Sequence, residues 1–439
     1  MIASAGERVG EAAEDRRRET GRAFLVGGSL AAALVFFYFL STLTGAGGSQ
    51  LQGTTAGSGS TPGIILPDQM ASAGAPSAWT QARSSASGNA AWGPAVDAPF
   101  SRLWELDPGT GREFFSAPAI VGGVLYFGCN DGKLRAVNAA SGSVIWSFQT
   151  ICGICGEPAV DSSGVYFGAQ DGTLYALDRG TGARMWSAGV GYHIFCDTGI
   201  LCDTLVITGN SMGKICALGI SDGEPVWSNE LGGLVLGPVI LDSICVFTTE
   251  NGKVSAYSAS GNCLWTRSFT GQSSAPASDG EAVFAGFSDG TVRRLDLSDG
   301  EVDWETDIVA SSSRTVLARP VLVDTLLLVG TCDGRLVCLG SGGGRVLWEQ
   351  SFENWLQLPP ASAGHRVYLA CDDQRLHVLD LATGAKLDSL EMGGYAGTAP
   401  VLADGRLYFG TAAGEFFALA GSPCREDSQD GVSGQGGAT

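Results

Sequence analysis

Charged side chains are scarce in this chain, and basic ones are the scarcest. They make up 16% of the 439 residues, and 26 Lys and Arg are set against 45 Asp and Glu, so the net charge is −19. Nucleic-acid binding relies on basic side chains that neutralise phosphates, so this balance argues against a nucleic-acid partner. Histidine is also rare, with three residues, and no Ser-His-Asp arrangement suggests itself. The usual hydrolytic machinery is therefore not predicted.

Glycine is abundant, with 65 residues, and much of it lies in a unit that recurs about every 40 residues. The unit at 171–186 reads DGTLYALDRGTGARMW, and related copies start at residues 131, 251, 289 and 333. The second residue of its first turn is found at Gly132, Gly172, Gly213, Gly252, Gly290, Gly334, Gln374 and Gly414. Its closing tryptophan is found at Trp104, Trp146, Trp186, Trp227, Trp265, Trp304 and Trp348. A period near 40 with strand-like content indicates a β-propeller.

One repeat, residues 156–188, shows why it must be stacked. A short apolar run, a turn and VYFG are followed by Asp-Gly, which favours a tight hairpin because glycine accepts a positive φ. TLYALD alternates large and small side chains, and a second turn leads into ARMW. Four short strands would form a blade that is apolar on both faces and stable only against neighbours. We interpret the motif as scaffold, with each tryptophan filling a gap between blades.

The number of blades follows from the ends of the repeat array. Seven units run from about 116 to 392, and an eighth at 398–421 lacks its fourth strand. Residues 101–107, SRLWELD, form a fourth strand without a blade, so joining the two closes the ring and removes free edges. The sequence predicts an all-β, eight-bladed propeller of four-stranded antiparallel blades over residues 99–421. Blade seven is irregular, with Asp388 in place of tryptophan and Gln374 in place of glycine.

The stretch LYALDRGTGARMW resembles the tryptophan-docking repeat of PQQ-like eight-bladed propellers, a family that includes quinoprotein dehydrogenases and BamB-type outer-membrane assembly factors. The stretch AWTQARSSASGNAAWGP at 78–94 is similar to the lead-in of such propellers, so the resemblance covers about 79–421. Quinone-binding members often use a vicinal disulfide and long pocket-forming insertions. This chain has neither an adjacent cysteine pair nor such insertions, so bound PQQ is not expected.

An uncharged run at 23–44 is long enough to span a bilayer as a helix. Arginines 16–18 and 22 precede it and no Lys or Arg follows until Arg83, which predicts a cytoplasmic segment 1–22 and an extracytoplasmic propeller. A cleaved signal peptide with a site at 44–46 is the alternative. No cysteine follows the run directly, so the lipid attachment of the BamB type is not predicted. Residues 45–98 are expected to be a flexible tether and lead-in, and residues 422–439 a disordered tail.

The connections between blades hold the residue types that are common in interface hot spots. We predict that the following side chains contact a partner: Arg112, Phe114, Tyr192, Arg314, Arg319, Trp355 and Tyr395. The alternative for each is local packing or solvation.

Two successive connections also hold a cysteine and histidine set. Cys152 and Cys155 form one pair, and His193 and Cys196 form a second pair one repeat later. Three thiolates and an imidazole could bind zinc. Disulfides, either Cys152 with Cys155 or Cys196 with Cys202, and packed free thiols are the alternatives.

Three functions remain open at this point. The first is a membrane-anchored extracytoplasmic propeller that acts as a protein–protein interaction scaffold, with a BamB-like assembly role and other membrane or envelope proteins as partners. The second is a PQQ-dependent quinoprotein dehydrogenase. The third is a permanent structural subunit of a larger membrane complex. In each, residues 23–44 would contact the lipid bilayer.

Overall fold

The computed structural model describes residues 63–64, 90–92, 94–107, 116–308, 316 and 318–423 of the chain. The expected cytoplasmic segment 1–22, the expected membrane helix 23–44 and most of the expected tail lie outside these ranges. Within them, no helix combines the length and apolar character that a membrane crossing requires.

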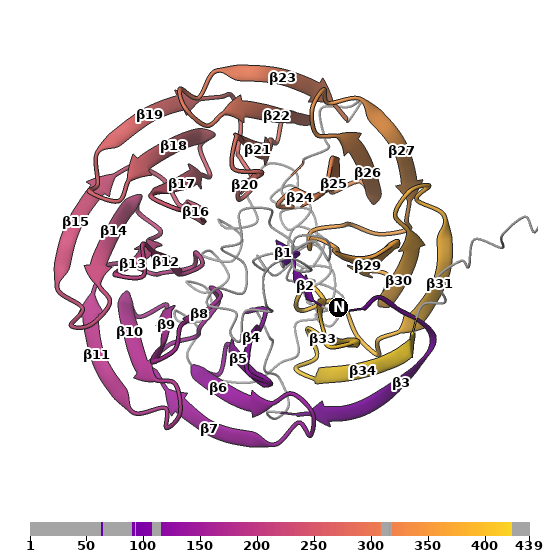
Figure 1. Ribbon diagram of the computed structural model, residues 1–439, viewed down its shortest axis with the longest axis horizontal. Helices are drawn as coiled ribbons and strands as arrows, with labels where there is room; N and C mark the ends of the chain where they lie inside the picture. Colours follow the sequence, from indigo (N-terminus) through magenta and orange to yellow (C-terminus); the bar gives the residue numbers. More distant parts are fainter. Residues whose placement is uncertain are drawn as a thin grey trace, which may run out of the picture.

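The described residues form eight sheets arranged in a ring, and each sheet is one blade (Figure 1). Seven sheets have four strands, and the eighth has six. Within the four-stranded blades every neighbouring pair of strands is antiparallel, as in the pairing of β9, β10 and β11. The predicted fold class and the number of blades are therefore confirmed.

The strands follow the chain from the inner to the outer edge of each blade. Blades 1 to 4 consist of β4 (Ala119–Val121), β5 (Val124–Gly128), β6 (Lys133–Asn138) and β7 (Val144–Gln149); β8 (Ala159–Val160), β9 (Gly164–Gly168), β10 (Thr173–Asp178) and β11 (Arg184–Gly189); β12 (Gly199–Leu201), β13 (Leu205–Gly209), β14 (Lys214–Gly219) and β15 (Pro225–Glu230); and β16 (Val235–Leu241), β17 (Ile244–Thr249), β18 (Lys253–Ser258) and β19 (Cys263–Ser268).

Blades 5 to 8 continue in the same order. They consist of β20 (Ala277–Ser278), β21 (Ala282–Gly286), β22 (Thr291–Asp296) and β23 (Val302–Asp307); β24 (Val321–Val323), β25 (Leu326–Gly330), β26 (Arg335–Gly340) and β27 (Val346–Ser351); β28 (Ala361–Ala363), β29 (Arg366–Cys371), β30 (Arg375–Asp380) and β31 (Lys386–Glu391); and β32 (Val401–Ala403), β33 (Arg406–Gly410), β34 (Phe416–Pro423) and β3 (Val96–Leu106). Blade 8 also carries β1 (Gly63–Ile64) and β2 (Ala90–Trp92) at its inner edge.

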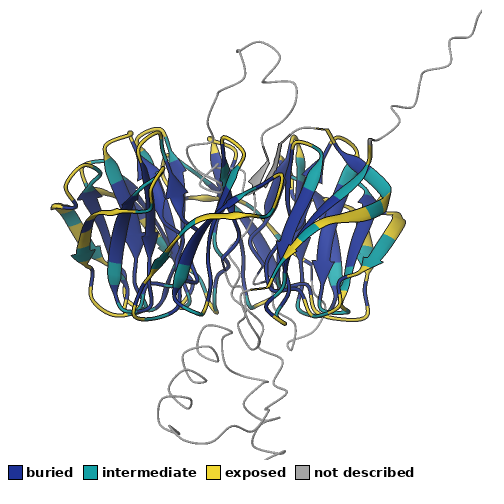
Figure 2. Cartoon of the chain, turned by 90° about the horizontal axis from the view of Figure 1, so that it is seen from below, coloured by how far each residue is buried: buried dark blue, intermediate teal, exposed yellow. Residues whose placement is uncertain are grey.

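Blade 2 shows how the repeat produces this register. Gly172 has a φ of +78°, a backbone conformation that is strained for residues with a side chain. The turn at this glycine lets β9 and β10 pair directly, beginning with Leu174 opposite Gly168. The middle strand β10 is buried on both faces except at its ends, whereas most residues of the outer strand β11 are exposed and Trp186 is buried (Figure 2). In blade 7 the same turn position is taken by Gln374 with a φ of +67°, so the predicted irregularity is a non-glycine residue in left-handed backbone.

Each tryptophan of the repeat joins its blade to the next one. Trp186, for example, donates its Nε1–H to the carbonyl of Ile220 at 3.0 Å, and its ring lies against Gly223 so closely that a Cβ there would approach it to 2.5 Å. The same hydrogen bond to the next blade is made by Trp104, Trp146, Trp227, Trp265, Trp304 and Trp348. The motif therefore serves as scaffold, as interpreted from the sequence.

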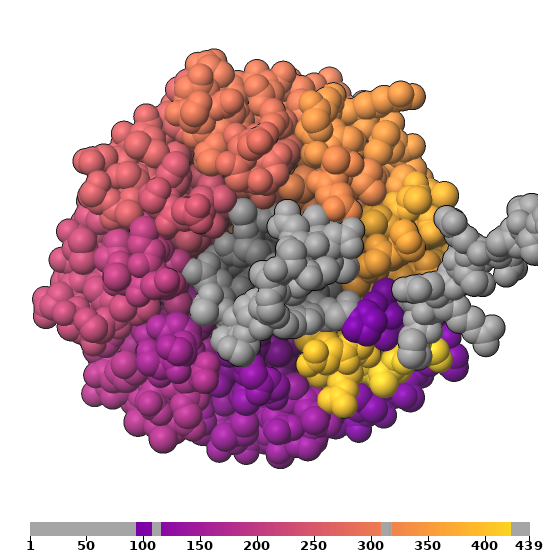
Figure 3. All heavy atoms as spheres, in the orientation of Figure 1, coloured from indigo at the N-terminus to yellow at the C-terminus, as the bar shows by residue number. Residues whose placement is uncertain are grey.

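Strand β3 closes the ring as the fourth strand of blade 8, pairing antiparallel with β34. In Figures 1 and 3 the indigo N-terminal strand accordingly lies beside the yellow C-terminal strand. The sequence did not predict the inner edge of this blade, where β2 pairs in parallel with β32 and β1 with β2. These two strands belong to residues expected to be tether and lead-in.

Candidate functional site

One face of the ring carries both the hairpin between the second and third strands of each blade and the connections between blades. In blade 2 the connection after β11 lies over the β9–β10 hairpin, because the Gly172 carbonyl accepts hydrogen bonds from the N–H groups of Val190 and Gly191. The hairpin of residues 170–172 also bonds to the preceding connection, from Gln170 N–H to the Gly153 carbonyl at 2.9 Å. We call this the hairpin face, defined by residues 150–154, 170–172, 190–194 and 210–213 and their equivalents in other blades.

Large apolar side chains are exposed on the hairpin face over blades 1 to 3. Ile151 is 88% exposed, Tyr192 66% and Met212 56%. Their segments are hydrogen-bonded in sequence, since Ser211 N–H donates to the His193 carbonyl at 2.8 Å and the hairpin at 170–172 bonds to both flanking connections. We call Ile151, Tyr192 and Met212 the apolar patch. Large apolar side chains that are exposed on a hydrogen-bonded backbone are typical of a contact surface for another protein.

The predicted contact residues divide into three groups. Tyr192, Trp355 and Tyr395 are exposed in connections between blades, and their contact with a partner stays a prediction. Arg112, Phe114 and Arg314 lie outside the described residues. Ile151 and Met212 were missed, although a large apolar residue in a turn or connection is a signal that the sequence contains.

The prediction that Arg319 contacts a partner does not fit its position, because the residue is only 2% exposed. Its Nη2 lies 3.5 Å from Oδ2 of Asp197, which is also buried. Arg319 precedes β24 of blade 6 and Asp197 precedes β12 of blade 3, so the ion pair reaches across the axis of the ring. Asp197 Oδ1 also accepts the N–H of Glu157 in the neighbouring connection, at 3.1 Å. These charged groups link connections around the axis.

The predicted zinc residues lie in adjacent connections, but their ligand atoms do not converge. A Cβ at Gly156 would lie 2.1 Å from the Cys196 carbonyl oxygen, so the two connections touch. Cys155 Sγ accepts a hydrogen bond from Gln170 Nε2 at 2.7 Å, and a ring nitrogen of His193 contacts the Gln170 carbonyl.

Cys196 Sγ is directed into its own blade, where the Gly209 N–H donates to it at 3.0 Å, and burial raises the pKa of this thiol to about 12. All eleven cysteines in the described ranges are reduced, so neither predicted disulfide is formed there. Zinc bound by Cys152, Cys155, His193 and Cys196 stays a prediction.

A different group in blade 7 has the spacing that a metal ion requires. The ligand atoms of Cys371, Asp373 and His377 all lie within 4.8 Å of one another, a property that no other set of three such residues shares in the described part of the chain. No cluster of cysteines marks this place in the sequence, which shows only the irregular turn at Gln374 and one of the three histidines.

Comparisons with known proteins agree with this architecture. A family model described as outer membrane protein assembly factor BamB matches residues 81–193, 198–321 and 312–439. The chain is 28% identical to a protein of that name from Burkholderia pseudomallei, over 58% of the chain and 60% of the relative. It is also 28% identical to one from Shewanella oneidensis, over 41% of the chain and 49% of the relative. The matched stretches thus span about half to three fifths of these relatives.

Two solved structures share the fold. The crystal structure of BamB from Moraxella catarrhalis superposes with a TM-score of 0.62 at 20% identity, covering 75% of this chain and 100% of that one. A quinohemoprotein alcohol dehydrogenase from Pseudomonas putida superposes with a TM-score of 0.67 at 14% identity, covering 83% of each chain. At these identities the similarity concerns the fold alone. It includes one protein named as an alcohol dehydrogenase with redox cofactors and one named BamB.

Proposed function

The chain belongs to the family described as outer membrane protein assembly factor BamB, and from this premise we propose that it is an interaction scaffold in a cell-envelope assembly complex. The observation that carries the proposal is the apolar patch. Ile151 and Tyr192 lie on connections between blades and Met212 lies on the β13–β14 hairpin, and these segments are hydrogen-bonded to one another in sequence. A partner could therefore bury them without first ordering the scaffold, which lowers the entropic cost of association.

The charge of the chain fits the same proposal. A net charge of −19 keeps an isolated propeller soluble and disfavours binding to nucleic acid. Around Ile151, Tyr192 and Met212 the contact would be driven by apolar burial, and Trp355 and Tyr395 offer two further aromatic side chains on the same face.

We expect the double variant Ile151→Ser with Met212→Ser to lose the scaffold function while remaining folded. Each exposed residue contributes little to folding, so the unfolding free energy should change by about 1 kcal/mol or less. If both are hot spots, partner affinity should fall by a factor of about 100 or more. The measurement is complementation of a deletion strain, read out as the amount of folded outer membrane protein, together with co-purification from mild detergent.

The matched control for this experiment is Ile145→Ser with Met185→Ser. These side chains are also exposed, at 50% and 44%, but they lie on the outer strands β7 and β11 instead of the hairpin face. The control should complement like the wild type. Equal complementation by both double variants, or no effect of the deletion on outer membrane proteins, would refute the proposal.

We also propose that residues 23–44 anchor the chain with the propeller outside the cytoplasm, because arginines flank only the N-terminal side of this apolar run. Protease added to the extracytoplasmic side should then cut between residues 45 and 89 and release the propeller, while residues 1–22 stay protected. The measurement is immunoblotting with tags at each end. A propeller that is digested only after the cytoplasm is opened would contradict this orientation.

A further inference from the structure

Blade 7 contains a compact set of sulfur, nitrogen and oxygen donors that the scaffold function does not use. We propose that Cys371, Asp373 and His377 bind one Zn²⁺ ion, with solvent as the fourth ligand. Their ligand atoms already lie within 4.8 Å of one another, and Cys371 and His377 are buried. Thiolate, imidazole and carboxylate are the three side-chain ligands of zinc in proteins, and a sulfur–nitrogen pair favours Zn²⁺ over Mg²⁺ or Ca²⁺.

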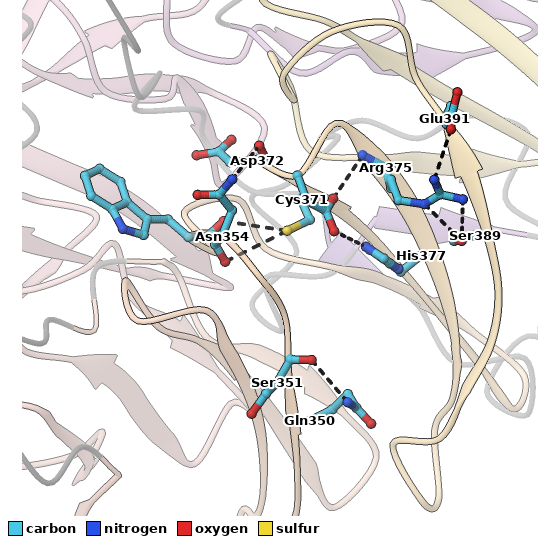
Figure 4. Close-up of polar contacts among 11 residues, drawn as sticks. Gln350, Ser351, Asn354, Cys371, Asp372, Arg375, His377, Ser389 and Glu391 are labelled. Atoms are coloured by element: carbon cyan, nitrogen blue, oxygen red, sulfur yellow. Dashed lines mark hydrogen bonds and ion pairs between the residues drawn. The ribbon is translucent and has the colours of Figure 1, made fainter.

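The β29–β30 hairpin places the three donors together. Cys371 ends β29 opposite Arg375, and His377 in β30 lies opposite Leu369, so Cys371 and His377 are on the same face of the hairpin. Figure 4 shows both side chains beside the turn that joins the two strands. Asp373 lies in this turn and accepts the N–H of Arg375 at 3.0 Å, which fixes its carboxylate over the same face.

In the absence of an ion, Asp373 accepts a hydrogen bond from His377 Nε2 at 2.7 Å. The Cys371 Sγ lies 3.9 Å from the Asn354 carbonyl oxygen and 4.0 Å from the Trp355 carbonyl oxygen. One proton therefore lies between His377 Nε2 and Asp373, and the thiol proton is directed at the two backbone carbonyls. A Zn²⁺ ion would replace both: the S–H bond breaks and its proton leaves to solvent, a Zn–S bond forms, and the imidazole proton moves from Nε2 to Nδ1.

Binding of Zn²⁺ would also balance the charges of the ligands at this largely buried site. One Zn²⁺ with one thiolate and one carboxylate is neutral, whereas a lone buried carboxylate must be held by hydrogen bonds alone. The Arg375 guanidinium does not compete for the site, because it bonds to Ser389 Oγ and to Glu391. The ring of Phe352 packs against His377 at 4.9 Å between centroids and keeps the imidazole in place.

Blade 1 shows what the same hairpin does without a metal-binding donor set. It has Cys129, Asp131 and Arg135 at the spacing of Cys371, Asp373 and His377. There the Arg135 guanidinium makes a buried ion pair with Asp131. A guanidinium has no lone pair with which it could bind a metal ion. Blade 5 repeats that solution with Arg293 and Asp289. In blade 7 His377 also makes a hydrogen bond with its aspartate, Asp373. An imidazole, unlike the guanidinium of Arg135 or Arg293, has a lone pair that can bind a metal ion.

The test uses the full chain, stripped of metal with a chelator and titrated with Co²⁺ as a spectroscopic substitute for Zn²⁺. We expect one Co²⁺ per chain, with a thiolate-to-metal charge-transfer band and tetrahedral d–d bands, and we expect Zn²⁺ to displace it. Cys371→Ser should abolish the charge-transfer band. His377→Gln should weaken binding by about 100-fold or more, since removing even a hydrogen-bond partner of a ligand costs 10- to 100-fold.

The control is Cys129→Ser, which removes the equivalent thiol of blade 1 and should leave the titration unchanged. Circular dichroism identifies a variant that does not fold, and His377→Gln then decides the question, because it keeps all thiols. No charge-transfer band in the wild type would overturn the proposal. A band that survives Cys371→Ser and disappears in Cys152→Ser would overturn it too, and would place the ion in the connections after β7 and β11.

Discussion

Replacing Trp265 by alanine is expected to lower the free energy of unfolding by about 4 kcal/mol. Large-to-small changes of buried aromatic residues typically cost about 3–5 kcal/mol. Trp265 is only 6% exposed, its Nε1–H donates to the Leu297 carbonyl at 2.7 Å, and its ring fills the space above Gly300. The variant therefore opens a cavity between blades 4 and 5 and leaves a carbonyl without its donor. The measurement is urea unfolding followed by far-UV circular dichroism.

Trp355→Ala is the matched control, because it removes the same side chain from a connection on the hairpin face. Trp355 is 41% exposed, and within the described part of the chain its indole N–H makes no hydrogen bond to a carbonyl of the following blade. Its loss should cost about 1 kcal/mol or less. If the two variants were equally stable, the tryptophans of the repeat would not be what holds neighbouring blades together.

The repeat could be read from the sequence because one local rule is used in every blade. A left-handed turn position favours glycine, a pleated strand favours alternating side chains, and the space between blades favours a large flat ring. Each of these preferences therefore appears in the sequence about every 40 residues. The closure by residues 101–107 followed from the same rule, since a blade without a fourth strand and a fourth strand without a blade complete each other.

Features that depend on the closed ring could not be predicted in this way. Arg319 lies more than 100 residues from Asp197, and only the closed ring of eight blades brings the start of blade 6 close to the start of blade 3 at the axis. The pairing of β2 with β32 was hidden because three residues of Ala and Trp carry no strand periodicity of their own.

The two cysteine and histidine groups differ in how the fold places their side chains. Cys152 and Cys196 were grouped because their connections are equivalent, yet equivalent positions on neighbouring blades direct their side chains into different surroundings. Cys371, Asp373 and His377 lie within one hairpin, where the register alone decides which side chains meet. In the described part of the chain, spacing within one hairpin thus brings three donor atoms within 4.8 Å of one another.

The junction between blades 7 and 8 lacks a tryptophan for a structural reason. Elsewhere the ring packs on a glycine in the turn between the third and fourth strands of the next blade. In blade 8 these strands are β34 and β3, which come from opposite ends of the propeller and have no such turn. Asp388 in place of tryptophan therefore removes a side chain that would have no glycine to pack on.

Other contacts fasten this junction. The Tyr368 hydroxyl of β29 accepts the Val96 N–H at 2.6 Å and donates to the Val96 carbonyl at 2.7 Å. Arg366 bonds to both carboxylate oxygens of Asp97, at 2.6 and 3.2 Å. Blade 7 thus holds the first two residues of β3, the strand that closes the ring.

Tyr368→Phe is accordingly expected to destabilise the protein by about 2–4 kcal/mol. The change leaves the buried N–H and carbonyl of Val96 without a hydrogen-bond partner, at a cost of about 1–3 kcal/mol each. Tyr368 is fully buried, and Pro423, which lies opposite Val96 on β34, has no N–H to give to the vacated carbonyl. Hydrogen exchange should rise first in β3, since the loss acts on the closing strand. Tyr408→Phe, which removes one longer hydrogen bond of 3.3 Å to the Ala139 carbonyl, should cost about 1 kcal/mol. Equal losses in the two variants, or unchanged exchange in β3, would mean that Tyr368 does not hold the ring closed.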